Sequence, residues 1–310
     1  MLNSIFILIV AMGMVIKGAT MATTYAERLA KSYRLSEYAV GFIIVSVISV
    51  LPEAFIAINS AIEGVPSFGL AMLFGSNITD LTLIFAIIVF YAGRGLKIES
   101  KVLKNHATYS FVLLLPLVLG LDGHFSRLEG LALIIAGLVF YYSALREGME
   151  NRPALNENGY DWHKSFLLLM FSMVVMVIGA YFTVTSATSI ASHLNVSPIL
   201  IGMLIVGLGT AVPELFFSLK SVKRREDSLA VGDILGIVLA DATIVVGILA
   251  LIDPFFFPQK IIYVTGAFMI VASFILFHFM RSRRTLSKRE ASLLLVFWLV
   301  FVSVEFIITR

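Results

Sequence analysis

The sequence predicts an all-α integral membrane protein: ten transmembrane helices in two inverted-topology five-helix repeats. Three observations carry this prediction. Apolar segments of membrane-spanning length recur along all 310 residues, Lys and Arg concentrate in every second connector, and the second half of the chain matches the first at one constant offset. No connector is long enough for a soluble domain of ordinary size, so we expect one membrane domain.

The composition is that of a chain solvated mostly by lipid. Hydrophobic residues make up 59% and charged residues 14%, against about a quarter charged in ordinary soluble domains. The absence of cysteine excludes a disulfide framework and a thiolate metal site. The basic residues lie in connectors and form no stripe that would bind nucleic acid. No Lys or Arg precedes Lys17, so we interpret the N-terminal apolar run as the first span and not as a cleaved signal peptide.

Ten apolar segments are the expected transmembrane helices. They lie at approximately residues 3–25, 38–62, 66–92, 106–121, 128–145, 165–190, 197–219, 228–252, 259–280 and 291–309. The first and sixth segments run into small and polar residues, which need protein or water neighbours inside a membrane.

The distribution of basic residues predicts the topology. Nineteen of the 23 Lys and Arg residues lie in the connectors that follow the odd-numbered spans, and on the opposite side only Arg127, Lys260 and Arg310 are basic. The positive-inside rule therefore places the odd-numbered connectors in the cytoplasm and both termini outside. We expect a multi-pass protein of the plasma membrane.

A single offset, the one that places Glu53 on Glu214, aligns the two halves without a gap from residue 18 to beyond residue 82. It pairs Gly18 with Gly179, Gly41 with Gly202, Ser49 with Thr210, Pro52 with Pro213, Glu53 with Glu214, Gly75 with Gly236, Asp80 with Asp241 and Thr82 with Thr243. Because each half has an odd number of spans, the halves have opposite orientations. We expect a first repeat at 1–145, a cytoplasmic connector at 146–164 and a second repeat at 165–310. Secondary transporters use such inverted repeats to build a site at the membrane midplane.

Each half carries one Glu directly after a Pro and one Asp in the next span, at the same spacing in both halves: Glu53 and Asp80, then Glu214 and Asp241. An ionisable side chain at mid-span costs about 2.5–3.5 kcal/mol on insertion scales. Four of them in a mirrored pattern favour a water-lined cavity or a bound cation over a structural kink. Carboxylate, hydroxyl and carbonyl oxygens suit calcium and sodium, and suit zinc or copper poorly.

The prolines explain why carbonyl oxygens are free beside the glutamates. Proline has no N–H and clashes with the preceding turn, so carbonyls near residues 48–49 and 209–210 lose their helical partners. Ser49 and Thr210 lie four residues before the glutamates and share a helix face with them, and Ser76 stands in the same relation to Asp80. At the matching place before Asp241 the chain has Ile237.

These residues resemble the calcium/cation antiporter superfamily, and within it the sodium/calcium exchanger branch. That family's repeats read approximately G-[TS]-S-x-P-E, followed in the next span by G-N-x-x-G-S-x-x-x-[ND]. The corresponding segments here are "ISVLPE" (48–53), "GTAVPE" (209–214), "AMLFGSNITD" (71–80) and "GDILGIVLAD" (232–241). The proton/calcium branch usually carries a G-N-x-x-E pattern that is not evident here.

The resemblance implies a role for each matching residue. Glu53 and Glu214 would be the central calcium ligands, shared alternately with sodium, and Ser49 and Thr210 would contribute hydroxyl and backbone oxygens. Ser76 would line a flanking sodium site. Asp80 and Asp241 would sit beside the glutamates. The first and sixth spans would slide across the rest to alternate access.

The sequence departs from the family pattern at several positions that carry oxygen ligands. Val50 and Ala211 replace a hydroxyl, Ile237 replaces a Ser, Met72 and Asp233 replace Asn, and Asp80 stands where one half often has Asn. These departures weaken the flanking sodium sites, most of all in the second half.

We therefore predict a secondary antiporter that exchanges Ca²⁺ for Na⁺, with a reduced sodium stoichiometry as one form of it. A proton-coupled divalent cation exchanger is the alternative, because Asp80 and Asp241 exceed the charge of one Ca²⁺ and at least one should be protonated at neutral pH. An intramembrane enzyme is disfavoured, since there is no H-E-x-x-H or Gly-x-Gly-Asp motif. A passive channel is a further alternative, and conductance in a bilayer recording would distinguish it from an antiporter. We expect inorganic cations and the lipid bilayer as partners, with no cofactor and no obligate protein partner.

Overall fold

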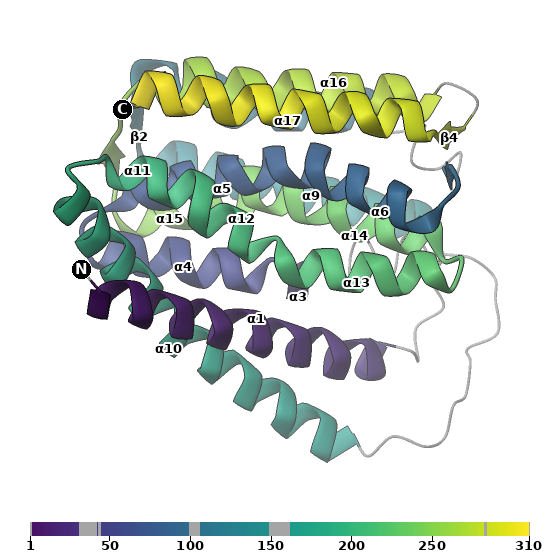
Figure 1. Cartoon of the computed structure of the whole chain (residues 1–310), viewed down its shortest axis with the longest axis horizontal. Helices are drawn as coiled ribbons and strands as arrows, with labels where there is room; N and C mark the ends of the chain where they lie inside the picture. The colour runs from purple at the N-terminus through teal and green to yellow at the C-terminus, as the bar shows by residue number, and fades with distance from the viewer. Residues whose placement is uncertain are drawn as a thin grey trace.

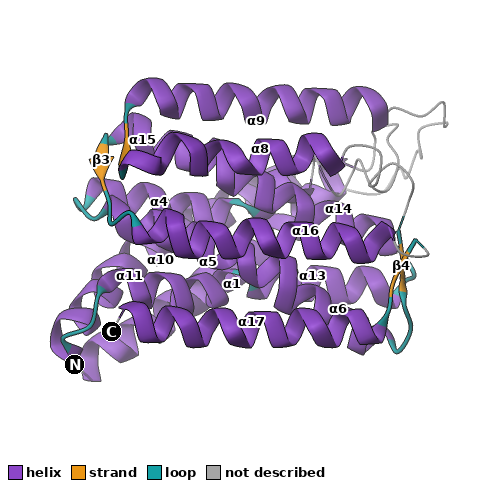
Figure 2. Cartoon of the chain, turned by 90° about the horizontal axis from the view of Figure 1, so that it is seen from above, coloured by secondary structure: helices purple, strands orange, loops and turns teal. Residues whose placement is uncertain are grey.

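The computed structural model is a bundle of long helices with a short strand pair at each end (Figures 1 and 2). It describes residues 2–30, 42, 45–98, 106–148, 162–281 and 284–309. The start of the second predicted span and most of the connector at 146–164 lie outside these residues. The two chain ends that the figures mark lie at the same end of the bundle.

Most helices and strands of the two halves follow each other in a similar order. The first half has α1 Leu2–Ala30, α3 Ser46–Ser49, α4 Leu51–Ile62, α5 Pro66–Thr79, the π-helical turn η2 Asp80–Ile84, α6 Phe85–Ala92, β1 Leu96–Lys97, α8 His106–Leu119, η3 Gly120–Asp122, β2 His124–Phe125 and α9 Arg127–Gly148. The second half has α10 Trp162–Leu194, α11 Pro198–Ile201, the π-helical turn η4 Gly202–Val206, α12 Gly207–Thr210, α13 Val212–Lys223, α14 Asp227–Ala240, the π-helical turn η5 Asp241–Val245, α15 Val246–Ile252, β3 Phe255–Phe256, the π-helical turn η6 Ile261–Gly266, α16 Ala267–Arg281, β4 Thr285–Leu286 and α17 Lys288–Thr309.

Each predicted span contains a helix. Within the described residues, eight helical segments are long and apolar enough to cross a membrane, and two more, at Ser46–Ile62 and Thr108–Asp122, are apolar but shorter. The second span is described only in part, and η3 follows α8 after 14 residues. The all-helical membrane fold is confirmed, whereas a count of ten spans stays a prediction.

The repeat extends well beyond the part that the sequence aligns. The offset that pairs Glu53 with Glu214 also pairs both ends of α3 with those of α12, α4 with α13, α5 with α14, η2 with η5, α9 with α17, and β2 with β4. Matching helix bounds over this length mean that the two halves share one backbone design. The inverted repeat is confirmed.

Two antiparallel strand pairs tie the halves together. Strand β1 of the first half pairs with β4 of the second, with Leu96 opposite Leu286, and β2 pairs with β3, with Phe125 opposite Phe255. Figure 2 shows β4 and β3 at opposite ends of the bundle. Each end therefore has one strand from each half, as an inverted repeat requires.

The core of the bundle consists of the two continuous segments Pro66–Ala92 and Asp227–Ile252. In the most apolar window of each, 83% of residues are buried, against 33% for α1 and α10 and 22% for α17. Figure 1 shows α1 and α10 on one side of this core and α16 and α17 on the other. The four predicted acidic residues lie in or against these central segments.

Close helix crossings at the core depend on two glycines. A Cβ on Gly75 would clash with the carbonyl oxygen of Met203, and one on Gly236 would clash with the carbonyl oxygen of Phe42. Both glycines and both of their neighbours are related by the offset of the repeat. Each half therefore inserts its central helix against the kinked helix of the other half, with no space for a side chain.

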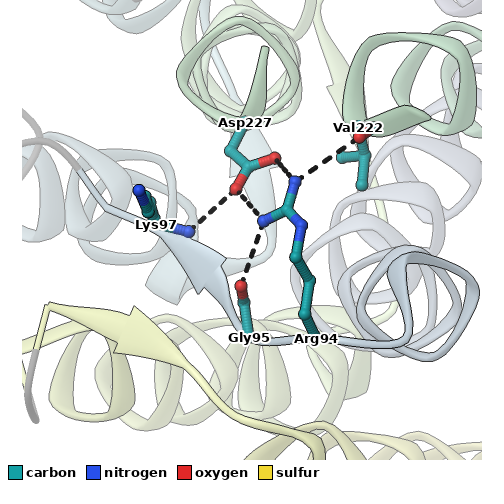
Figure 3. A network of polar contacts seen from close by, with 5 residues as sticks. All are labelled: Arg94, Gly95, Lys97, Val222 and Asp227. Carbon is teal, nitrogen blue, oxygen red and sulfur yellow. Dashed lines mark hydrogen bonds and ion pairs between the residues drawn. The ribbon is translucent and has the colours of Figure 1, made fainter. Parts of the chain in front are cut away.

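A charged contact fixes the beginning of α14 (Figure 3). Arg94 donates to both carboxylate oxygens of Asp227, at 2.6 and 2.7 Å, and the backbone N–H of Lys97 donates to the same carboxylate at 3.0 Å. The hydrogen bonds to Asp227 raise the pKa of the Arg94 guanidinium above its usual range. The positions equivalent to Arg94 and Asp227 in the repeat are Phe255 and Pro66, so this clamp exists at one end of the bundle only.

Candidate functional site

Two proline breaks position the glutamates. Helix α3 ends at Ser49 and α4 begins at Leu51, and α12 ends at Thr210 before α13 begins at Val212. Proline stands second in α4 and α13, so the carbonyls of Ile48 and Gly209 lose the amide donor four positions on. Each carbonyl instead accepts a backbone N–H at the end of α3 or α12, so these two are not left free as the sequence predicted. Each glutamate follows its proline, in the first turn of the new helix, where the helix dipole favours a negative charge.

The aspartates begin π-helical turns. Asp80 is the first residue of η2 and Asp241 the first residue of η5, in the middle of the two core segments. A π-helical turn shifts the hydrogen-bond pattern by one residue and is frequent at functional sites. Thr82 and Thr243 donate their hydroxyls to the carbonyls of Ile78 and Leu239 and so support the two turns in the same way.

All seven predicted site residues are buried in the core. Glu53, Asp80 and Glu214 are 1% exposed, Ser49 is 2% exposed, and Ser76, Thr210 and Asp241 are fully buried. Within the part of the chain that the structure describes, both carboxylate oxygens of Asp80 and Glu214, and one each of Glu53 and Asp241, lack a hydrogen-bond partner. No Lys, Arg or His within the described ranges forms an ion pair with them. Buried oxygens of this kind are costly unless an ion or a proton satisfies them.

The acidic residues of the two halves interact with one another. The charge of Glu53 acts on Asp80, Glu214 and Asp241, and the charge of Asp80 acts on Glu214 and Asp241. The mirrored sequence motifs therefore meet in one region of the core.

The hydroxyl groups lie beside carboxyl groups of the opposite half. The Ser76 hydroxyl donates to Oδ2 of Asp241 at 3.4 Å, although Asp80 is its neighbour along the chain. Thr210 lies beside Glu53. This pairing differs from the simplest expectation of a hydroxyl and a carboxylate on one helix, because the close packing of the two halves brings the opposite helices nearer.

The structure adds one acidic residue that the sequence analysis recorded only as a departure. Asp233 on α14 is fully buried, and neither of its carboxylate oxygens has a hydrogen-bond partner. It lies beside Ser49, and the charge of Glu53 acts on it. Its repeat equivalent is Met72, so a search for mirrored acids passes over it. An unrepeated acid inside a predicted span was the signal that could have found it.

The acidic side chains do not form a closed metal cage. Within the described ranges, no group of three or more His, Cys, Asp or Glu side chains is placed to hold a metal ion. A cation in this region would need hydroxyl and carbonyl oxygens to complete its ligand set. Calcium and sodium accept such mixed oxygen ligands.

Tyrosines of the first half hold the backbone next to the site. Tyr141 donates to the carbonyl of Gly236 at 2.7 Å, and Tyr109 donates to that of Leu235 at 2.9 Å. In the other half, Trp298 donates to the Thr79 hydroxyl at 3.2 Å. These bonds fix the segments that lead into η5 and η2, and the sequence analysis did not predict them.

Comparison with known proteins gives a consistent result. A family model described as "Sodium/calcium exchanger protein" matches residues 3–145 and 164–307. Relatives include the sodium/calcium exchanger MaX1 of Methanosarcina acetivorans, 23% identical with 97% of this chain and 98% of that protein covered, and the inner membrane protein YrbG of Escherichia coli, 26% identical with 82% and 81% covered. A structure of the sodium-calcium exchanger NCX_Mj soaked with Na⁺ and Sr²⁺ matches with a TM-score of 0.73 at 21% identity, with 97% of each chain covered.

Proposed function

The chain belongs to the sodium/calcium exchanger protein family, and from that premise we propose that it exchanges Ca²⁺ for Na⁺ by alternating access at a site between Glu53 and Glu214. Its coarser function, cation antiport across a membrane, follows from the family. The chain is a transporter and not an enzyme. The finer proposal rests on one observation: two mirrored glutamates, buried and close enough to interact, have carboxylate oxygens with no hydrogen-bond partner among the described residues.

The charge of the site suits the two ions. Glu53 and Glu214 supply two negative charges, which match one Ca²⁺ or two Na⁺. Exchange requires that both ions compete for the same ligands, so that the loaded protein changes conformation while the half-loaded protein does not. Ser49, Thr210 and Ser76, together with carbonyls at the proline breaks, would complete the oxygen ligands. Asp80 and Asp241 would flank them.

Helices α1 and α10 are the elements proposed to move. They are less buried than the core segments and pack against each other obliquely, from the contact of Ser4 with Ser189 to that of Gly18 with Met176. They cross closely at Gly18 and Gly179, where a Cβ would meet Met176 and Val15. These contacts are related by the repeat, so a shift toward either face would replace one set of contacts with its mirror image.

We also propose the orientation that the basic residues predict, with the odd-numbered connectors in the cytoplasm and both termini outside the plasma membrane. Both described ends of the chain lie at one end of the bundle, together with β3, and β4 lies at the other end. The repeats at 1–145 and 165–310 would form one membrane domain.

The experiment that tests the proposal is calcium flux into vesicles that contain the purified protein. An outward sodium gradient should drive Ca²⁺ uptake, and uptake should cease when choline replaces sodium on both sides. A pH gradient without sodium should drive little uptake. Vesicles with the Glu214→Gln variant control for leakage.

Proton coupling is the second candidate, favoured by Ile237 in place of a hydroxyl and by the unpaired oxygens of Asp80. Uptake that ignores sodium and follows the pH gradient would replace the first proposal with this one. Single-channel conductance in a planar bilayer would overturn alternating access for both.

A further inference from the structure

One acidic residue of the core has no acidic counterpart in the other half, and its carboxylate oxygens have no partner within hydrogen-bond distance among the described residues. Asp233 lies on the second turn of α14, is fully buried, and has two carboxylate oxygens without a hydrogen bond. A buried carboxylate in this condition needs a cation or a proton. The ligands carried over from the family motif do not include it.

Its neighbours come from the kinked helix of the first half. Asp233 lies beside the Ser49 hydroxyl, and the charge of Glu53 acts on it. This placement follows from the helix crossing at Gly236, which rests directly on Phe42 and Ser46. One turn away from the crossing, α14 brings Asp233 to the end of α3, next to the proline break.

The mirror-related place in the other half lacks this additional carboxylate. There Met72 occupies the position of Asp233, while Thr210 and Glu214 occupy those of Ser49 and Glu53. A thioether is a soft ligand and a poor partner for a hard cation. The described structure therefore brings the Asp233 carboxylate, the Ser49 hydroxyl and the Glu53 carboxylate together. At the mirror-related place the first of these three groups is absent.

We infer that Asp233, Ser49 and Glu53 form a subsite for one monovalent cation, of the Na⁺ class, on one side only of the central pair of glutamates. The inference rests on the proposed function, since it assumes that Glu53 and Glu214 bind the exchanged ions. Asp233 places one more carboxylate beside Glu53, and one monovalent cation would offset the charge of that carboxylate. Oxygen ligands select a hard ion.

Asp233 also supplies oxygen ligands in the half of the chain where Ile237 replaces a hydroxyl. Ile237 removes an oxygen beside Asp80, at the mirror image of the contact between Ser76 and Asp241. Asp233 supplies an oxygen at a different place in the same half. Asp233 thus offsets one of the lost oxygen ligands, at a different position relative to the glutamates.

The test measures ⁴⁵Ca²⁺ bound to the purified full chain in detergent while NaCl replaces choline chloride at constant ionic strength. In Asp233→Asn, half-displacement of bound Ca²⁺ should need at least about tenfold more Na⁺ than in the wild type, as expected when one charged partner is lost. The displacement curve should also become less steep. Asp233→Met, which copies the mirror position, should behave alike and serves if the Asn variant does not fold.

A matched control is Asp253→Asn, the same substitution at a partly exposed residue that follows α15. If Na⁺ displaces Ca²⁺ from Asp233→Asn and Asp233→Met as it does from the wild type, the subsite is overturned. The proposed function then stays intact. Loss of Ca²⁺ binding in both variants also overturns it, since Asp233 would then be a calcium ligand. A wild-type protein that binds no Ca²⁺, or whose Ca²⁺ does not respond to Na⁺, contradicts the proposed function itself.

Discussion

Helices α3 to α6 in the first half and α12 to α15 in the second follow the same course, and most of their bounds are related by the offset that pairs Glu53 with Glu214. Both contain a proline break before a buried glutamate and a π-helical turn that starts at an aspartate. Their polar side chains differ. The first half has Ser76 where the second has Ile237, and the second half has Asp233 where the first has Met72.

The difference separates two requirements of an exchanger. The shared backbone gives two equivalent conformations, open to one side or to the other, and any substitution that breaks the helix crossings would affect both. The oxygen ligands decide which ions bind and how many, and they need no symmetry. The repeat therefore constrains the backbone and its helix crossings more strongly than it constrains the oxygen ligands.

The largest expected effect comes from substituting Glu53 or Glu214, the glutamates that the two halves share. Glu53→Gln and Glu214→Gln should each reduce calcium exchange at least about 100-fold, because losing one partner of a buried charged contact costs roughly 3–5 kcal/mol. Vesicle flux measures the loss, and Glu63→Gln, at the exposed end of α4, is the matched control. Exchange that survives in either variant would mean that the two glutamates are not the shared ligands.

A second prediction concerns the helix crossings that the two halves share. Gly75→Ala and Gly236→Ala should each destabilise the protein by about 1–3 kcal/mol, because the added methyl group meets a backbone carbonyl of the opposite half. The two effects should be similar, since the crossings are mirror images. Thermal unfolding in detergent measures them, with Gly13→Ala as control because no atom lies within 4 Å of its added Cβ. Equal melting of all three variants would contradict the close crossing.

The smallest effect should come from restoring symmetry in the ligands. Ile237→Ser puts a hydroxyl beside Asp80 and should increase the apparent affinity for sodium about 2–10-fold, the gain expected from one added polar contact. Sodium dependence of calcium flux is the measurement. Val238→Ser, at the next fully buried residue of the same helix, controls for the lost apolar volume. Sodium dependence that is the same in both variants would remove Ile237 from the site.

Much of the architecture was predictable because it depends on local chemistry. The span Pro66–Ala92 agrees residue for residue with the predicted one, since proline begins it and glycine follows it. The breaks before Glu53 and Glu214 follow from proline alone. The acidic pairs and their spacing were visible through the repeat. The π-helical turns were not predicted, because they depend on how neighbouring helices pack.

The sequence by itself determined that the chain is a membrane protein, that its halves are inverted repeats, and that each half has a kinked helix bearing a glutamate and a helix bearing an aspartate. These properties follow from the composition, the periodicity and the covalent structure of the chain. Only the tertiary structure decided which side chains meet. The contact of Ser76 with Asp241 and the place of Asp233 beside Ser49 join residues from opposite halves, far apart along the chain. Such contacts arise from helix crossings, and a crossing is set by the packing of whole helices, which no short stretch of sequence specifies.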